Sequence, residues 1–139
     1  MSNRDEDYVI NLCDLVLKSK AKRNYRFDFL RGDPGKNGRC VRLPVDAYYG
    51  ELKLVIEYRE RQHTEAVPIM DKRRTCSGCS RGEQRRLYDQ RRRDVLPKHD
   101  IRLVELGYEL FEHDNMKRLR RNALADEAVI QALLADFLP

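Results

Sequence analysis

The stretch LKLVIEYRERQH, residues 52–63, decides how the rest of the chain is interpreted. Apolar residues occupy every second position from Leu52 to Tyr58, which predicts a β-strand with one buried face. Glu57 and Arg59 fall on the opposite face of this strand, so it turns a carboxylate and a guanidinium away from that core. We therefore expect the far end of this strand to carry the functional site.

The segment before this strand supplies a second carboxylate. Residues 40–49 alternate in the same way, and the Gly-Glu pair at positions 50–51 fits a two-residue hairpin turn. Such a turn places Asp46 opposite Val55, so that Asp46 and Glu57 become diagonal neighbours, roughly 7–8 Å apart at the backbone. Two carboxylates held in this way form a hard oxygen site suited to Mg²⁺. The alternative is a solvent-facing sheet surface on which these side chains are simply hydrated.

The rest of the pattern predicts an α/β fold, with a mixed β-sheet flanked by helices. The length of 139 residues fits one domain, with a core over about residues 5–112 and an additional C-terminal helix. A loop rich in Gly, Pro, Asn and Asp separates the first two strands. The predicted helices span residues 5–17, 83–98 and 115–138, and the other predicted strands span residues 25–30, 40–49 and 101–106.

Composition limits the class of protein. Apolar residues make up 41% of the chain, enough for a folded core, and charged residues make up 37%. No apolar run approaches the roughly 18–20 residues of a membrane helix, and the acidic N-terminus does not resemble a signal peptide. We therefore expect a cytoplasmic protein that does not bind a membrane and whose four cysteines are reduced.

The positive charge is concentrated in one segment. Residues 72–93 contain nine Lys or Arg and two acids, a net charge of +7 in a chain whose net charge is +5. A localised basic stretch predicts a polyanionic partner, most simply nucleic acid. The alternative is a solvated arginine-rich helix that has no partner.

Five arginines on the predicted helix 83–98 are candidates for contact with DNA phosphates. A seven-residue spacing places four of them in two rows, which we expect on the outer side of the helix. The fifth lies nearer the apolar stripe and is expected to reach toward the site. The rows are Arg85 with Arg92 and Arg86 with Arg93, and the fifth is Arg91. The stripe expected to face the sheet consists of Leu87, Tyr88, Val95 and Leu96.

The segment TCSGCS, residues 75–80, contains a Cys-x-x-Cys pair. Cys76 and Cys79 would supply half of a structural Zn²⁺ site. His63, Cys40 and Cys13 are the candidates to complete such a site, but none of them stands at a diagnostic spacing. We therefore favour two free loop thiols over a zinc site.

The order of these residues resembles the very-short-patch-repair-type endonucleases of the PD-(D/E)xK nuclease superfamily. In that group, an Asp on one strand precedes an apolar strand that ends in a Glu, and a His follows a few residues later. A helix then carries an Asp, an Arg three residues on and a Leu four beyond that. The matching residues here, within about residues 27–106, are Asp46, Glu57, His63, Asp89, Arg92 and Leu96. Taken by themselves, Asp89 and Arg92 equally fit a simple ion pair one helical turn apart.

The resemblance implies a restriction-endonuclease-like fold and hydrolysis of DNA that depends on Mg²⁺ or Mn²⁺. Asp46 and Glu57 would hold the metal ion. Some members of the superfamily add a metal-shell acid on the first helix, for which Glu6 is the nearest match.

One departure from the superfamily concerns its usual Glu-x-Lys, which here ends in Arg59. Arginine effectively never loses its proton, so Arg59 cannot act as a general base. It is instead expected to grip the scissile phosphate. Activation of the attacking water would then fall to the metal ion, or to His63 with Gln62 orienting it. The alternative for His63 is a hydrogen bond to backbone at the strand end.

Two classes of function therefore remain open from the sequence. The first is a metal-dependent DNA endonuclease. The second is a nucleic-acid-binding module whose site is weak or inactive, which the arginine at position 59 keeps open. A third interpretation is an adaptor that binds a protein partner, or forms a homodimer, through the C-terminal helix.

Overall fold

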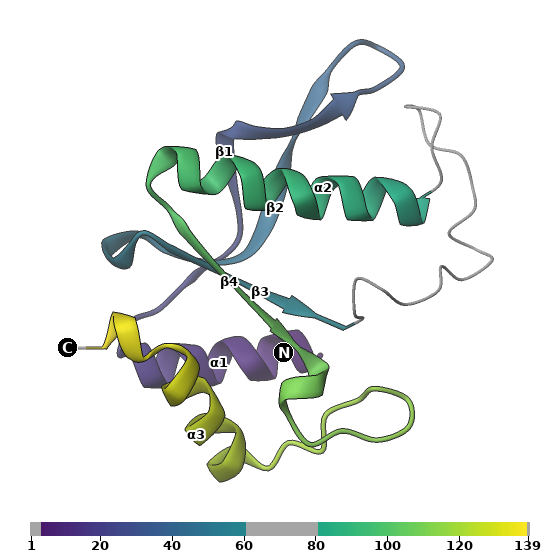
Figure 1. Cartoon of the computed structure of the whole chain (residues 1–139). Coiled ribbons are helices and arrows are strands. Elements are labelled where there is room, and N and C mark those ends of the chain that lie inside the picture. Colours follow the sequence, from purple (N-terminus) through teal and green to yellow (C-terminus); the bar gives the residue numbers. More distant parts are fainter. Residues whose placement is uncertain (1–3, 61–80, 139) are drawn as a thin grey trace.

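The computed structural model describes residues 4–60 and 81–138 (Figure 1). Its helices are α1 (Asp5–Leu17), α2 (Arg81–Val95) and α3 (Ala123–Leu133). Its strands are β1 (Lys22–Pro34), β2 (Cys40–Tyr49), β3 (Leu54–Arg59) and β4 (Arg102–Gly107). Short 3₁₀ turns follow β2, α2, β4 and α3, and these are η1 (Gly50–Leu52), η3 (Leu96–His99), η4 (Tyr108–Leu110) and η5 (Ala135–Phe137).

The four strands form one mixed sheet in the order β1–β2–β3–β4. β1 pairs antiparallel with β2, and β2 pairs antiparallel with β3. β3 and β4 are parallel, and α2 lies between them in the chain. The predicted α/β fold with a mixed sheet flanked by helices is confirmed.

Helices cover both faces of this sheet. Figure 1 shows α1 and α3 below the sheet and α2 above it. Two separate apolar cores result, one on each face. The core under α1 and α3 includes Val9, Cys13, Ile56, Leu106 and Ile130. The core on the α2 side includes Phe27, Leu30, Val45, Val55 and Leu96.

β3 is buried on both of its faces because it lies in the middle of the sheet. Every residue from Leu54 to Tyr58 is buried. Ile56 contributes to the core under α1 and α3, whereas Val55 contributes to the core on the α2 side. Glu57 points to the same side as Val55 because side chains alternate along a strand. A carboxylate only 2% exposed therefore lies under α2.

The C-terminal helix is shorter than predicted. It begins at Ala123, where the side chain of Asn122 caps it by accepting a hydrogen bond from the backbone N–H of Ala125. The predicted start at residue 115 is wrong because the carboxylate of Asp114 binds two backbone N–H groups and folds the following residues into a turn. On α3, Leu124 remains 83% exposed.

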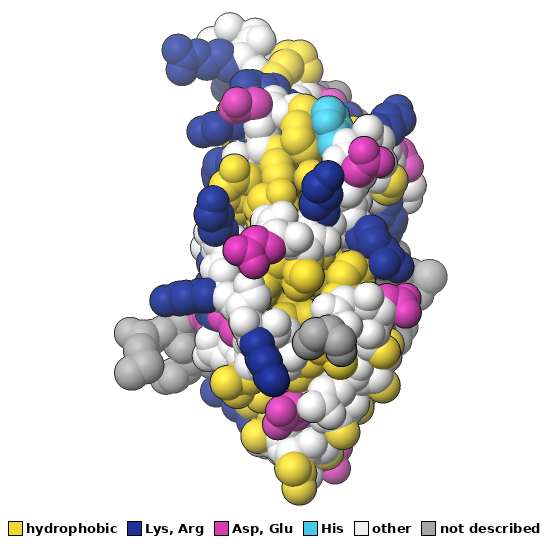
Figure 2. All heavy atoms as spheres, turned by 90° about the vertical axis from the view of Figure 1, so that its left-hand side faces the viewer, with side chains coloured by type: hydrophobic (Ala, Val, Ile, Leu, Met, Phe, Trp, Pro, Cys, Tyr) yellow, Lys and Arg dark blue, Asp and Glu magenta, His cyan; other side chains and the backbone are white. Residues whose placement is uncertain are grey.

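Part of the outer surface is apolar. On the side of the molecule shown in Figure 2, hydrophobic side chains form a band with Lys and Arg side chains along both borders. Within the described ranges, no helix is both long enough and apolar enough to cross a membrane.

Candidate functional site

The turn after β2 sets the positions of Asp46 and Glu57. A 3₁₀ turn at Gly50–Leu52 replaces the predicted two-residue turn, so the expected pairing of the two strands is wrong. The observed register pairs Ala47 with Ile56. Continued by one residue, it sets Asp46 directly opposite Glu57 instead of diagonal to it.

Backbone hydrogen bonds fix both carboxylates. The N–H of Asp46 donates to Oε2 of Glu57 at 2.6 Å. The N–H of Tyr58 in turn donates to Oδ2 of Asp46 at 2.8 Å. Each carboxylate thus has one oxygen held by the backbone of the neighbouring strand. Both side chains are oriented by the sheet itself, which is the rigid support that a binding site needs.

The charge of this pair is poorly compensated. Burial raises the pKa of Glu57 to about 8, and the negative charge of Asp46 contributes to the rise. Arg59 and Arg92 oppose the rise, but their nearest nitrogens lie 3.6 Å and 3.4 Å from Oε1 of Glu57, which is beyond a good hydrogen bond. At neutral pH, Glu57 therefore tends to keep a proton.

Glu6 on α1 belongs to the same electrostatic cluster. Burial raises the pKa of Glu6 to about 7, and the charge of Asp46 is the next largest cause. Arg4 lies 3.6 Å from Glu6 and partly offsets this effect. Asp46 therefore interacts electrostatically both with Glu57 on β3 and with Glu6 on α1.

The carboxylates of this cluster can supply part of the coordination shell of a magnesium ion. Across the described stretches of the chain, no three His, Cys, Asp or Glu side chains converge closely enough to form a ready-made metal site. Mg²⁺ commonly takes only one or two carboxylates and fills its shell with water and substrate phosphates. Asp46 and Glu57 can supply those two carboxylates, and a cation there would relieve the unfavourable burial of negative charge.

Arg92 holds α2 against this part of the sheet. Its Nε and NH2 donate to the backbone carbonyl oxygen of Pro44 at 3.1 Å and 2.9 Å. Its NH1 donates to Oδ1 of Asp89 at 3.1 Å. The Arg92 side chain is 12% exposed and that of Asp89 is 8% exposed. The Asp–Arg pair of α2 is therefore a buried link between α2 and the part of the sheet that carries Glu57.

Arg59 is the centre of a second group of ion pairs. Its Nε and NH2 donate to Oε1 of Glu105 on β4 at 3.1 Å and 2.8 Å, and its NH1 lies 3.1 Å from Asp89. Arg93 donates two more hydrogen bonds to Glu105, both at 2.9 Å. Three carboxylates, Glu57, Asp89 and Glu105, thus surround Arg59. In this state its guanidinium is committed to side chains of the protein.

The prediction of two outward arginine rows on α2 is wrong for its C-terminal half. Arg92 and Arg93 turn toward the sheet because Asp89, Glu57 and Glu105 lie there. Arg85 and Arg86 are exposed, as expected.

The remaining expectations for α2 also need correction. Arg91 binds Asp33 and the carbonyl oxygen of Arg31 near the end of β1, and therefore does not reach the carboxylate cluster. Leu87, expected in the buried stripe, is 50% exposed. The other three stripe residues, Tyr88, Val95 and Leu96, pack against the core on the α2 side as predicted.

Several predicted site residues lie outside the described part of the chain. These are Gln62, His63, Cys76 and Cys79. Of the two cysteines that the structure describes, Cys13 is buried in the core under α1 and Cys40 is half-buried at the start of β2, and both are free. Burial raises the pKa of the Cys13 thiol to about 12.

Sequence reasoning did not identify Glu105 as part of the site. In the parallel register of β3 and β4, Glu105 is the direct partner of Glu57. The signal in the sequence was an acid within the otherwise apolar run of the strand IRLVEL.

Comparisons of the chain with known protein families, with curated proteins and with solved structures found no match.

Proposed function

We propose that this protein is a metal-dependent endonuclease that hydrolyses phosphodiester bonds in DNA, on a restriction-endonuclease-like fold similar to that of the very-short-patch-repair-type enzymes. The order of the elements supports this proposal. The chain runs through a helix, three antiparallel strands, a helix and a parallel strand, and the four strands form one mixed sheet. The acidic pair lies on the middle strands of that sheet, supported from α2.

The observation that carries the proposal is the paired arrangement of Asp46 and Glu57. Two carboxylates are held opposite each other by backbone hydrogen bonds, and burial together with their mutual repulsion keeps the pKa of Glu57 near 8. A structural role would be served better by an uncharged pair, because burial of like charges is costly. A divalent cation would offset that cost.

The residues have distinct roles in this proposal. Asp46 and Glu57 would hold Mg²⁺ or Mn²⁺, with Glu6 next to them in its outer shell. Such an ion, when bound, lowers the pKa of a water molecule and shields charge on the phosphate. Arg92, which is held by Asp89, would place its positive charge 3.4 Å from Glu57.

The role of Arg59 differs from that expected from the sequence. It keeps Glu57 and Glu105 in place, and a direct grip on the scissile phosphate would require its ion pairs to rearrange. His63 and Gln62 follow β3 in the sequence, and His63 remains the proposed acceptor of the proton from the attacking water.

Cleavage assays on defined DNA test this function. Purified protein is incubated with nicked, mismatched, branched and fully paired DNA, in Mg²⁺, in Mn²⁺ and in EDTA. We expect strand cleavage that requires the divalent ion and that falls by at least about 100-fold in Asp46→Ala and in Glu57→Gln. The matched control is Asp28→Asn, because the Asp28 side chain is an acid on the same sheet that is 85% exposed. That variant should cleave as the wild type does.

The second candidate function is DNA binding without turnover. It is favoured by one observation, the commitment of Arg59 to Glu105 and Asp89. Absence of cleavage of every DNA form in Mn²⁺, together with tight DNA binding, would establish this alternative. Cleavage that survives in Asp46→Ala would contradict the assignment of the site.

A further inference from the structure

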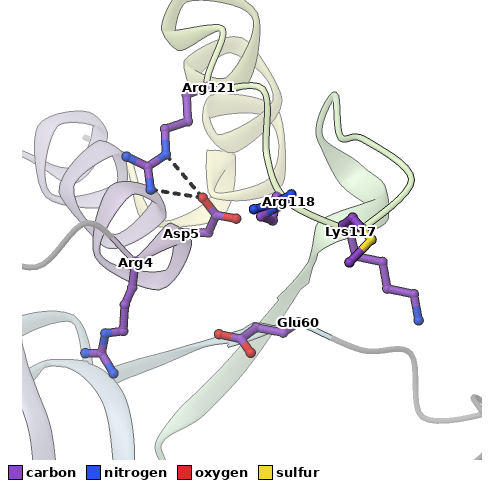
Figure 3. A pocket seen from close by; sticks show the side chains of 7 residues that line it. Arg4, Asp5, Glu60, Lys117, Arg118 and Arg121 are labelled. Carbon is purple, nitrogen blue, oxygen red and sulfur yellow. Dashed lines mark hydrogen bonds and ion pairs between the residues drawn. The ribbon is translucent and has the colours of Figure 1, made fainter.

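A pocket of about 440 Å³ lies where α1 begins (Figure 3). Its walls come from three places that are far apart in the sequence, namely the start of α1, the residue after β3 and the turn before α3. Volumes of about 300–1,000 Å³ are usual for ligand sites. Six charged residues line the pocket: Arg4, Asp5, Glu60, Lys117, Arg118 and Arg121.

Cations outnumber acids in this pocket, and one of its two acids is neutralised within it. Oδ1 of Asp5 lies 3.1 Å from both Nε and NH2 of Arg121, as the dashed lines in Figure 3 show. Oδ2 of Asp5 accepts a hydrogen bond of 2.9 Å from the backbone N–H of Leu119. Asp5 therefore serves to tie the turn before α3 to α1. The lining residues alone include four cations and two acids, and two of the cations also lie near acids outside the lining, Arg4 at 3.6 Å from Glu6 and Arg118 at 3.6 Å from Asp114.

The turn that carries Lys117 and Arg118 is ordered by its own hydrogen bonds. Oδ1 of Asp114 accepts the N–H groups of Met116 and Arg118 at 2.8 Å and 3.0 Å. Lys117 has a φ of 65°, in the left-handed region, which places it at the tip of the turn. The Arg118 side chain is 72% exposed. Two cations are thus presented to solvent from a backbone that is already fixed.

The pocket adjoins the acidic cluster of the candidate site. Arg4, which is 58% exposed, lies 3.6 Å from Glu6, and Glu6 responds to the charge of Asp46. Glu60 directly follows the last residue of β3, the strand that carries Glu57. A DNA strand that approaches Asp46 past the start of α1 would therefore pass next to the pocket.

We propose that this pocket binds a backbone phosphate of DNA. This phosphate would neighbour, on the same strand, the phosphate at the carboxylate pair. This inference rests on the proposed function, because it assumes that DNA lies over Asp46 and Glu57. Arginine and lysine donors are the usual partners of phosphate oxygens, and such contacts position a strand without reading its sequence. A free nucleotide carries the same phosphate chemistry, and the experiment below separates the two sources.

Salt-dependent DNA binding tests the proposal without relying on cleavage. The variant is Lys117→Asn with Arg118→Gln, since asparagine tolerates the left-handed backbone at position 117. The matched control is Lys98→Gln with Arg102→Gln, which removes two exposed cations at the opposite end of the parallel strand pair. Binding of a duplex in EDTA is measured by fluorescence anisotropy between 50 and 200 mM salt, and circular dichroism verifies folding. The slope of log K against log salt is negative, and each lost phosphate contact reduces its magnitude by about 0.9.

We expect the pocket variant to reduce the magnitude of this slope by about 0.9 relative to wild type, because one phosphate contact is lost, and the control to leave it unchanged. An unchanged slope, or an equal decrease in both variants, would overturn the proposal. If the pocket variant does not fold, the single variant Arg118→Gln should reduce the magnitude of the slope by up to about 0.9, and an unchanged slope would again overturn the proposal. Thymidine monophosphate is titrated as a second ligand, and saturable binding that the variant loses, with the duplex slope unchanged, would assign the pocket to free nucleotides instead.

The outcome is independent of the test of the proposed function. If the wild type cleaves DNA and the pocket variant binds DNA with an unchanged slope, the proposed nuclease activity stands and phosphate binding in the pocket is refuted. A decreased slope in a protein that never cleaves would support the pocket on a DNA-binding module.

Discussion

Glu57 and Glu105 occupy partner positions on parallel strands, yet their pKa values shift in opposite directions. Burial opposes the change at Glu105, but hydrogen bonds from Arg93 and Arg59 lower its pKa. Glu57 receives one hydrogen bond from the backbone of Asp46 and only distant guanidinium groups, so burial raises its pKa to about 8. Two adjacent acids with separated pKa values are typical of sites in which one has a structural role and the other a chemical one.

The first prediction concerns stability as a function of pH. The pKa of Glu57 is raised from 4.5 in the unfolded chain to about 8 in the fold. Its contribution to stability is therefore fully present below pH 4.5 and is lost as the pH rises through about 8, by at most about 1.4 kcal/mol per pH unit. In EDTA, Glu57→Gln should be more stable than wild type at pH 8, and the difference should vanish near pH 4.5. Urea denaturation at several pH values measures the free energy of unfolding of both proteins. If their stabilities change with pH in the same way, the burial of an ionisable Glu57 is contradicted.

Glu105→Gln is the matched comparison, with the opposite sign. The pKa of Glu105 is lowered in the fold, so its stabilising effect is present above the unfolded pKa and is lost as the pH falls. This variant should be less stable than wild type at pH 7, by about 1–3 kcal/mol, because it breaks ion pairs with Arg59 and Arg93. Both variants remove one acid, so a difference in how their stabilities depend on pH reports the different environments of Glu57 and Glu105 and not the loss of a charge.

The second prediction separates supporting from exposed arginines on α2. Arg92 is 12% exposed and donates to Pro44 and Asp89. Arg92→Ala should therefore lower the free energy of unfolding by about 3–5 kcal/mol, because it leaves buried acids and a carbonyl without their partner. Arg86→Ala removes an exposed arginine from the same helix and should change it by less than about 0.5 kcal/mol. Equal effects in thermal or urea unfolding would show that α2 does not pack on the sheet through Arg92.

The third prediction tests the contact between α2 and β1. A Cβ atom at Gly32 would lie 2.8 Å from the hydroxyl oxygen of Tyr88, and that hydroxyl also accepts a hydrogen bond from the N–H of Asp33. Gly32→Ala should therefore cost about 1–3 kcal/mol of stability, measured by urea denaturation. The control is Gly35→Ala in the following turn, where the nearest atoms would lie 3.7 Å away. A cost at position 35 that matches the cost at position 32 would indicate a backbone effect common to both.

Much of the fold follows from local signals in the sequence. The predicted helix over residues 5–17 coincides with α1, and the predicted strand over residues 40–49 coincides with β2. In both elements, most of the apolar residues that recur with the period of the element pack in the core. Local sequence is therefore enough to predict their bounds. The C-terminal helix was misplaced because apolar residues such as Leu119 recur with helical spacing, whereas the carboxylate of Asp114 imposes a turn that periodicity does not report.

The site was predictable in part, for a physical reason. The proximity of Asp46 and Glu57 follows from two alternating strands joined by a short connection, and in the structure the N–H of Asp46 donates a hydrogen bond to Glu57. The inward turn of Arg92 and Arg93 was not predictable from the helix alone. Seven-residue spacing aligns side chains on a helix but does not say which side faces the sheet. That choice depends on Glu57 and Glu105, whose convergence under α2 is set by the tertiary fold.

The last prediction concerns how α2 meets DNA. Because Arg92 and Arg93 are engaged with the sheet, Arg85 and Arg86 are the exposed candidates of the predicted rows. Arg85→Ser with Arg86→Ser should lower the log–log slope of duplex binding against salt by up to about 1.8 and leave the stability within about 0.5 kcal/mol of wild type. By contrast, Arg93→Ser should destabilise the protein, because it removes two hydrogen bonds to Glu105. Anisotropy titrations and urea denaturation on the same samples measure both effects. A slope that depends on Arg93 but not on the Arg85–Arg86 pair would mean that the ion pairs under α2 open when DNA binds, and that the inner arginines are the ones that contact phosphate.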